Sequence, residues 1–268
     1  MKQMRQVAEA TVCGGGAAVG LVVAAIAVCM LSLWWDALGV ACIPPAVPVP
    51  TAELLAQVPS GSLLLSRHVT EATRKRTLFN LVTAAGDWYH CGLLLRHQGE
   101  LYVLDCMADG PTCNVKCAAH RPLGHGGPRL IPALQYMLLY SLNPGTCAVR
   151  RLEHPPNAEF ERRAWEAGVR ATRYDFLRGY EFPPKLLEAS AERFFGVGIG
   201  RRSNSAHLAS GVFCSEIAAL ILMELGVLDE SIGASSLAPW SFCRPTFEDH
   251  LMPGHRYGPL ERPDIFQA

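Results

Sequence analysis

The feature that most constrains this chain is an uncharged run near its start. Residues 12–35 contain no Asp, Glu, Lys or Arg, and from Ala17 onward they are almost wholly apolar. An apolar helix of about 20 residues, rising about 1.5 Å per residue, crosses a hydrocarbon layer of roughly 30 Å. The sequence therefore predicts a transmembrane anchor over residues 12–35.

The flanks of this segment predict its orientation. Lys2 and Arg5 precede it, and the pair Trp34-Trp35 closes it with the aromatic side chains that favour a membrane interface. The positive-inside tendency places residues 1–11 in the cytoplasm as a short tail. The rest of the chain is then expected on the non-cytoplasmic side.

A cleaved signal peptide is the alternative, and the protein would then be secreted. Basic residues, an apolar run and the small residues at 39–41 also fit that description. The run is longer than the 7–15 apolar residues usual in a signal peptide, and this favours the anchor.

The chain after the anchor divides into a spacer and one domain. Residues 36–50 are dense in proline toward their end, which predicts an extended stalk. Residues 51–268 have the length of a single catalytic domain. The chain holds 24 basic and 24 acidic residues, so its charge gives no reason to expect nucleic acid as a partner.

Residue patterns within this domain predict a mixture of strands and helices. Two strand-like runs joined by a short polar turn, 90–96 and 101–106, predict a β-hairpin. Further elements are expected as a helix at 129–142, a strand at 147–152, an amphipathic helix at 157–174 and a buried helix at 215–225. The proline-containing tail that follows is expected to be mostly irregular.

Cys214 is the candidate nucleophile because it opens the last of these helices. The thiolate is the reactive form of cysteine, and an ordinary thiol is only slightly ionised at neutral pH. A helix N-terminus and an adjacent imidazolium both stabilise the thiolate. His90, at the start of a predicted strand, is expected to supply the imidazolium, and His207 is the weaker alternative.

Asp105 is the candidate partner for the second ring nitrogen of His90. If His97 and Gln98 form the turn, position 90 lies opposite position 105. If residues 97–100 form the loop, position 90 lies opposite position 107. Both registers place His90 and Asp105 on the same face of the hairpin.

Four short motifs follow one another in an order that resembles the circularly permuted papain-like families. They are Gly61-Ser62-Leu63-Leu64-Leu65, His90-Cys91-Gly92, Asp105, and Cys214-Ser215-Glu216. Relatives include NlpC-type cell-wall peptidases and lecithin:retinol acyltransferase-like proteins, and the resemblance spans about residues 58–228. It implies an α+β fold whose antiparallel sheet packs against the nucleophile helix. Ser62 stands where the family usually has Asp, and Asp105 stands where many relatives have Glu.

The resemblance implies acyl-transfer chemistry through Cys214, His90 and Asp105, with an acyl-enzyme intermediate. A thiol peptidase or amidase acting on a peptide or amide is expected. A lipid acyltransferase or thioesterase acting on a lipid ester is the alternative with the same fold, and a catalytically inactive membrane-anchored binding module is another. Tyr174 and Tyr180 match a Tyr-Asp segment of the family and are expected to line the substrate site. No cofactor is expected.

Residues 106–125 support a third hypothesis, an ectodomain organised by metal or disulfides. Zinc-ligand residue types occur there as Cys113, Cys117, His120 and His125. No second cysteine pair or spaced histidine pair completes a known zinc pattern, so no metal site is predicted. A disulfide within this loop, or from it to Cys106 or Cys147, remains the other possibility.

Overall fold

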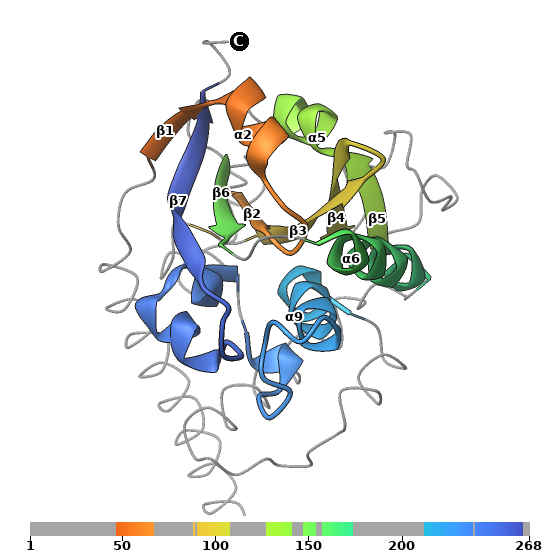
Figure 1. Ribbon diagram of the computed structural model, residues 1–268, viewed down its shortest axis with the longest axis vertical. Coiled ribbons are helices and arrows are strands. Elements are labelled where there is room, and N and C mark those ends of the chain that lie inside the picture. Colours follow the sequence, from red (N-terminus) through yellow and green to blue (C-terminus); the bar gives the residue numbers. More distant parts are fainter. Residues whose placement is uncertain are drawn as a thin grey trace, which may run out of the picture.

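The computed structural model describes residues 47–66, 88, 90–107, 127–140, 147–153, 157–173, 212–237 and 239–264. These residues form a seven-stranded sheet in the order β1-β7-β6-β2-β3-β4-β5, flanked by helices (Figure 1). Neighbouring strands are antiparallel except for β1 and β7, which are parallel. The α+β class and the antiparallel sheet predicted from the sequence are therefore confirmed.

The elements have the following bounds. The strands are β1 Val47–Pro50, β2 Leu63–Ser66, β3 His90–His97, β4 Glu100–Met107, β5 Gly127–Pro132, β6 Cys147–Leu152 and β7 Tyr257–Asp264. The α-helices are α2 Thr51–Gln57, α5 Ala133–Tyr140, α6 Ala158–Ala171 and α9 Cys214–Glu224. Short 3-10 helices follow as η3 Ala234–Ser236, η4 Pro239–Cys243 and η5 Pro245–His250.

Helices cover both faces of the sheet, and each face has its own core. In Figure 1, α2 and α5 lie on one side of the strands and α6 and α9 on the other. Successive strand side chains point to opposite faces. Leu63 and Leu65 of β2 therefore join the core beneath α6 and α9, while Leu64 joins the core beneath α2 and α5. All three side chains are buried, so β2 is a central strand covered on both faces.

The hairpin of β3 and β4 is confirmed, and its two-residue turn lies one residue further along the chain than the two-residue turn considered from the sequence. Gln98 and Gly99 form the turn with φ of 51° and 85°, and two positive φ values are typical of a type I′ turn. The ladder runs from His97 opposite Glu100 to Leu93 opposite Leu104. If this register is continued to the start of β3, position 90 lies opposite position 107, which is the second of the two alternatives derived from the sequence.

Three segments differ from the sequence prediction. The segment predicted to be a helix from residue 129 begins as strand β5, and α5 starts only at Ala133. The tail predicted to be irregular contains the eight-residue strand β7, whose Pro259 lies where its pairing with β6 shifts register. Strand β1 falls within the predicted stalk, so the sheet begins before residue 51.

The predicted membrane anchor lies outside the described residues, as do the tail at 1–11 and residues 36–46 of the stalk. Among the helices that the structure describes, none has the length and apolar character that crossing a bilayer requires.

Arg150 of β6 connects the sheet to the C-terminal segment. Its side chain is buried, and its Nε donates to Gly258 O at 3.1 Å. Its two terminal nitrogens donate to Phe242 O and to the Glu248 carboxylate, each at 2.5 Å. One guanidinium group therefore holds η4, η5 and β7 against the strand that precedes α6.

Candidate active site

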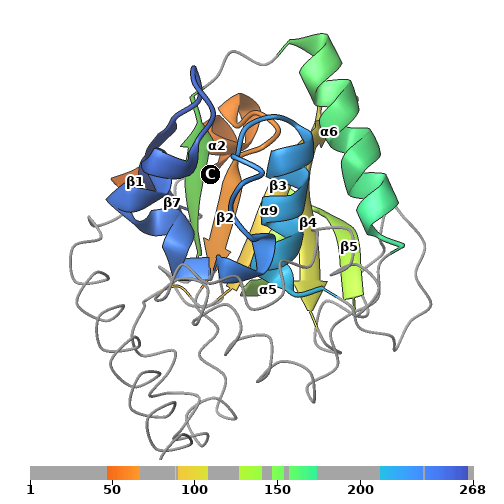
Figure 2. The ribbon, with the colours of Figure 1, turned by 90° about the horizontal axis from the view of Figure 1, so that it is seen from below.

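Cys214 is the first residue of α9, as the sequence predicts. Phe213 before it is extended (φ −118°, ψ 173°) and gives the helix no side-chain cap. The first helical hydrogen bond runs from Ile217 N to Phe213 O at 3.0 Å, so the Cys214 amide precedes it. Cys214 is partly exposed, whereas most of α9 is buried against β3 and β4 (Figure 2). Cys214 therefore keeps some solvent-exposed surface at the start of the helix.

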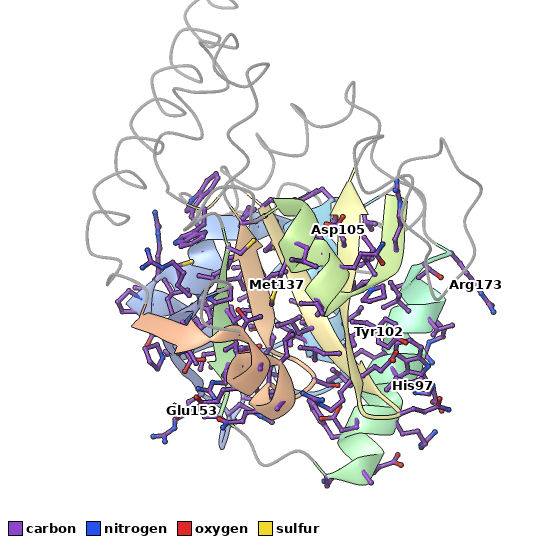
Figure 3. All side chains as sticks on the ribbon, turned by 90° about the horizontal axis from the view of Figure 1, so that it is seen from above. His97, Tyr102, Asp105, Met137, Glu153 and Arg173 are labelled. Atoms are coloured by element: carbon purple, nitrogen blue, oxygen red, sulfur yellow. The ribbon has the colours of Figure 1, made fainter. Side chains whose placement is uncertain are left out.

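His90 and Asp105 form a direct contact at the end of the hairpin. His90 Nε2 lies 2.5 Å from Asp105 Oδ1. Figure 3 shows Asp105 at the end of the hairpin opposite to the turn, which lies beside His97. Both side chains are buried, with 7% of His90 and 1% of Asp105 exposed. Because Nε2 donates its proton to the carboxylate, Nδ1 is the ring nitrogen left to face Cys214.

Charges around His90 favour its protonated form. Burial by itself lowers the pKa of the imidazole, because a charged ring is costly away from water. The negative charges of Cys214 and Asp105, and the hydrogen bonds that both make to the ring, outweigh that effect and raise the pKa to about 10. His90 is therefore an imidazolium at neutral pH, held between a thiolate and a carboxylate.

The thiol of Cys214 is ionised by its neighbours. Its pKa lies well below the usual value, first because the Cys91 thiol donates a hydrogen bond to its sulfur, and then because of the charge and hydrogen bond of His90. The backbone of Cys91 adds a further hydrogen bond, while burial opposes the shift. Cys91 itself is fully buried, and burial raises its pKa well above the usual value. Cys91 therefore stays protonated and acts as a donor.

Cys91 is the site residue that sequence reasoning missed. It occupies the middle of the His90-Cys91-Gly92 motif, a position to which we assigned no role. Its side chain points to the face of the sheet that α9 covers, where it joins the core that Cys214 packs against. The alternation of the strand could have indicated that face, but only the packing of α9 brings the two thiols together.

Gly92 completes the motif for a steric reason. A Cβ atom at this position would lie 2.5 Å from Val103 Cγ1 and 3.1 Å from Leu104 O. Strand β4 can therefore approach β3 closely only because residue 92 is glycine. Close approach at this end of the hairpin supports the contact between His90 and Asp105.

The two departures from the family pattern have different consequences. Ser62 is buried, and its Oγ accepts a hydrogen bond from Leu152 N at 3.1 Å, so it links the residue before β2 to the end of β6. Asp105, although shorter than Glu, reaches His90 Nε2 at 2.5 Å. The shorter carboxylate therefore does not prevent the contact.

Replacing Cys91 by alanine is expected to slow alkylation of Cys214 at pH 6 by several-fold to about tenfold, because a hydrogen bond to a charged acceptor is lost. The rate should recover at pH 9, where the thiol ionises without help. Iodoacetamide labelling followed by peptide mass spectrometry measures this rate. Cys147→Ala, a buried cysteine in the other core, is the matched control and should leave it unchanged. Equal rates in both variants would contradict the assigned role of Cys91.

Several candidates from the sequence lie outside the described residues. These are Tyr174, Tyr180, His207, Cys113, Cys117, His120 and His125. Cys106 and Cys147 are among the described residues, and both are buried. The loop cysteines with which they were expected to pair lie outside the described residues. Among the residues that the structure describes, no group of three or more His, Cys, Asp or Glu side chains is arranged to hold a metal ion.

Comparison with known proteins does not assign a family. No protein-family model matches the chain, and no curated protein matches it. Among solved structures, the chain is similar to one described as the crystal structure of metalloprotein yiiX from Escherichia coli O157:H7, DUF1105. The identity is 15%, the match covers 77% of this chain and 99% of the other, and the TM-score is 0.35. That score is too low to support an argument about fold or function.

Proposed function

We propose that this chain is a thiol hydrolase of the circularly permuted papain-like type, a peptidase or amidase. Cys214 is the nucleophile, His90 the general acid and base, and Asp105 the residue that orients the imidazole. One observation carries the proposal. A cysteine at a helix N-terminus meets a histidine whose other ring nitrogen contacts a buried carboxylate at 2.5 Å. This is the arrangement that nucleophilic catalysis by cysteine requires.

The first half of the reaction transfers the acyl group to the enzyme. The Cys214 thiolate attacks the substrate carbonyl carbon, and a carbon–sulfur bond forms while the carbonyl oxygen becomes an oxyanion. The Cys214 amide at the start of α9 is the donor we assign to that oxyanion. The His90 imidazolium then gives its Nδ1 proton to the leaving amine, and the carbon–nitrogen bond breaks.

The second half regenerates the thiolate. Neutral His90 takes a proton from water, and the water oxygen attacks the thioester carbon of the acyl-enzyme. The carbon–sulfur bond breaks, a carboxylic acid leaves, and His90 is again an imidazolium beside a thiolate. With a lipid ester as donor and an amine or alcohol in place of water, the same residues would perform acyl transfer, which is the alternative reaction.

The proposed cellular setting follows from the sequence. Residues 12–35 anchor the domain in the membrane, and the catalytic residues face the non-cytoplasmic side. The substrate is then a peptide, an amide or a lipid ester that is accessible from that side.

The test is formation of an acyl-enzyme with an activated ester. When the full-length protein is mixed with p-nitrophenyl acetate at pH 7, we expect a burst of about one equivalent of p-nitrophenolate and acetylation of the Cys214 peptide. Cys214→Ala should give neither, because it removes the nucleophile. Cys147→Ala should retain both, since Cys147 lies in the other core.

If the wild-type protein gave neither a burst of p-nitrophenolate nor an acetylated Cys214, this result would contradict the proposal that the chain is a thiol hydrolase. The inactive binding module would then be favoured. Transfer of the acetyl group to an added amine faster than to water would instead favour the acyltransferase.

A further inference from the structure

Two cysteine side chains meet where α9 begins. Cys214 is the first residue of the helix, and Cys91 lies on β3, the strand on which the helix packs. The Cys91 thiol donates a hydrogen bond to the Cys214 sulfur, and Cys214 packs against the core to which Cys91 belongs. The two sulfur atoms are therefore in direct contact. A disulfide, with its bond of about 2.05 Å, requires only that they come closer.

The two cysteines differ in exposure. Cys91 is 0% exposed, whereas Cys214 keeps some solvent-exposed surface. An oxidant in solution therefore meets Cys214 first. Cys214 is also the thiolate of the pair, because the hydrogen bond from Cys91 and the charge of His90 hold its pKa well below the usual value. An accessible thiolate beside a second thiol is the arrangement typical of redox-sensitive cysteines.

We propose that Cys214 is an oxidation site and that Cys91 is its resolving cysteine, so that a peroxide converts the pair into a disulfide. In the first step, the Cys214 thiolate attacks one oxygen of hydrogen peroxide. A sulfur–oxygen bond forms, the oxygen–oxygen bond breaks, and the departing hydroxide takes the proton of the His90 imidazolium and leaves as water. Cys214 is then a sulfenic acid, so the sulfur has been oxidised and the peroxide reduced.

The second step joins the two residues. The Cys91 sulfur attacks the Cys214 sulfur, a sulfur–sulfur bond forms, and the sulfur–oxygen bond breaks. The hydroxyl group leaves with the Cys91 proton as water. Burial is the largest cause that raises the pKa of Cys91, and the hydrogen bond to the Cys214 thiolate and its negative charge raise it further. A sulfenic acid is neutral, so oxidation of Cys214 removes these last two causes and makes Cys91 easier to ionise.

The disulfide would block the proposed catalysis reversibly. Cys214 cannot attack a substrate while its sulfur is bonded to Cys91, and a dithiol reductant restores both thiols by exchange. Without a resolving thiol, a sulfenic acid is oxidised further to a sulfinic acid, which dithiols do not reduce. Cys91 therefore protects the nucleophile from permanent loss.

Peptide mass spectrometry of the full-length protein, treated with hydrogen peroxide at pH 7, tests the proposal. Remaining thiols are blocked under denaturing conditions, and digestion by trypsin and a glutamate-specific protease places Cys91, Cys214 and Cys243 on different peptides. We expect two peptides linked through Cys91 and Cys214, which dithiothreitol separates. The assignment would be overturned if Cys214 stayed a thiol, became a sulfinic acid without forming a disulfide, or was linked to any other cysteine.

Variants test the role of Cys91. After peroxide and then dithiothreitol, iodoacetamide labelling of Cys214 at pH 9 should return nearly in full in the wild type. It should stay low in Cys91→Ala, because Cys214 is then oxidised beyond the sulfenic acid. Equal recovery in these two proteins would overturn the proposal. If Cys91→Ala does not fold by circular dichroism, the linked peptides of the wild type decide the matter alone.

Cys243→Ala is the matched control for this variant. Cys243 is another buried cysteine of the same core, and its charge acts on Cys91. We expect Cys243→Ala to form the disulfide and to recover Cys214 as the wild type does. Loss of the disulfide in this control would show that Cys91 is not the direct partner of Cys214.

The inference goes beyond the proposed function, because disulfide formation uses the Cys214 sulfur but does not require hydrolysis. The two proposals can therefore fail separately. A disulfide without a burst of p-nitrophenolate would count against the hydrolase only. A burst without the disulfide would count against the oxidation site only.

Discussion

His90→Ala is expected to slow alkylation of Cys214 at pH 6 by about 10- to 100-fold. The charge and the hydrogen bond of His90 both hold the pKa of this thiol below its usual value. An ordinary thiol with a pKa near 8.5 is ionised to only about 0.3% at pH 6. Loss of the imidazolium therefore removes most of the reactive thiolate, although the remaining thiolate is intrinsically more nucleophilic.

The alkylation rate of Cys214 is expected to depend on pH differently in the wild type and in His90→Ala. A lowered pKa keeps the wild-type thiolate present as the pH falls, so the wild-type rate should change little between pH 8 and pH 6. In His90→Ala the rate should fall with each pH unit over the same range, because the thiol takes up its proton sooner. Iodoacetamide labelling at a series of pH values, with the Cys214 peptide quantified by mass spectrometry, measures both profiles.

His97→Ala is the matched control. His97 ends the same strand on which His90 begins, and its ring stacks on Trp165 with the ring centroids 4.2 Å apart. It lies at the turn of the hairpin, away from Asp105 (Figure 3). We expect a profile within about twofold of the wild type, since no charge near Cys214 changes. A profile of His90→Ala that matches this control would show that the imidazole does not ionise the thiol.

Arg150→Met is expected to destabilise the domain by about 3 kcal/mol, which for a domain of this size corresponds to a fall in Tm of roughly 6–12 °C. Methionine fills much of the same volume but cannot donate. The carbonyl oxygens of Phe242 and Gly258 would then lose a buried donor, and Glu248 would lose its cation. Thermal unfolding followed by circular dichroism measures the change.

The aromatic neighbours of Arg150 add to this effect. Its guanidinium carbon lies 5.9 Å from the ring centroid of Phe247 and 5.5 Å from that of Tyr257. A cation over an aromatic face contributes about 0.5–2 kcal/mol, with the larger values where water is excluded. Arg150 thus stabilises the segment through hydrogen bonds and ring contacts together.

Arg162→Met is the corresponding control at the surface. Arg162 forms ion pairs with Glu159 and Glu166 on the outer face of α6, and more than half of its side chain is exposed. Exposed ion pairs contribute little to stability, so its Tm should stay close to that of the wild type. If Arg150→Met behaved like this control, the C-terminal segment would have to be held by its apolar contacts alone.

Local patterns were sufficient to predict several elements of the fold. Two strand-like runs joined by a short polar turn predicted β3 and β4. The helical spacing of apolar residues predicted α6, and the structure adds the hydrogen bond from Phe160 N to Asn157 Oδ1 that caps its start. Pairs of residues on a hairpin are close in sequence, so the shared face of His90 and Asp105 could also be derived in advance.

Elements at and near the sheet edges could not be predicted in this way. Strand β1 pairs with β7, which is more than 200 residues further along the chain. Both contain prolines, which on local grounds argue against a strand. Strand β5 forms because the edge of β4 offers it a partner, although the segment resembles the start of the helix that follows.

The sequence by itself determined which residue types were available for chemistry and the order in which they occur. It supplied a cysteine at a helix start, a histidine at a strand start and an aspartate one hairpin later. Only the tertiary structure decided the charge on the Cys214 sulfur. That charge depends on Cys91 and His90, which lie far from Cys214 in sequence. They meet Cys214 because α9 packs on the sheet. A thiol's ionisation is set by what surrounds it in space, and a linear pattern does not contain that information.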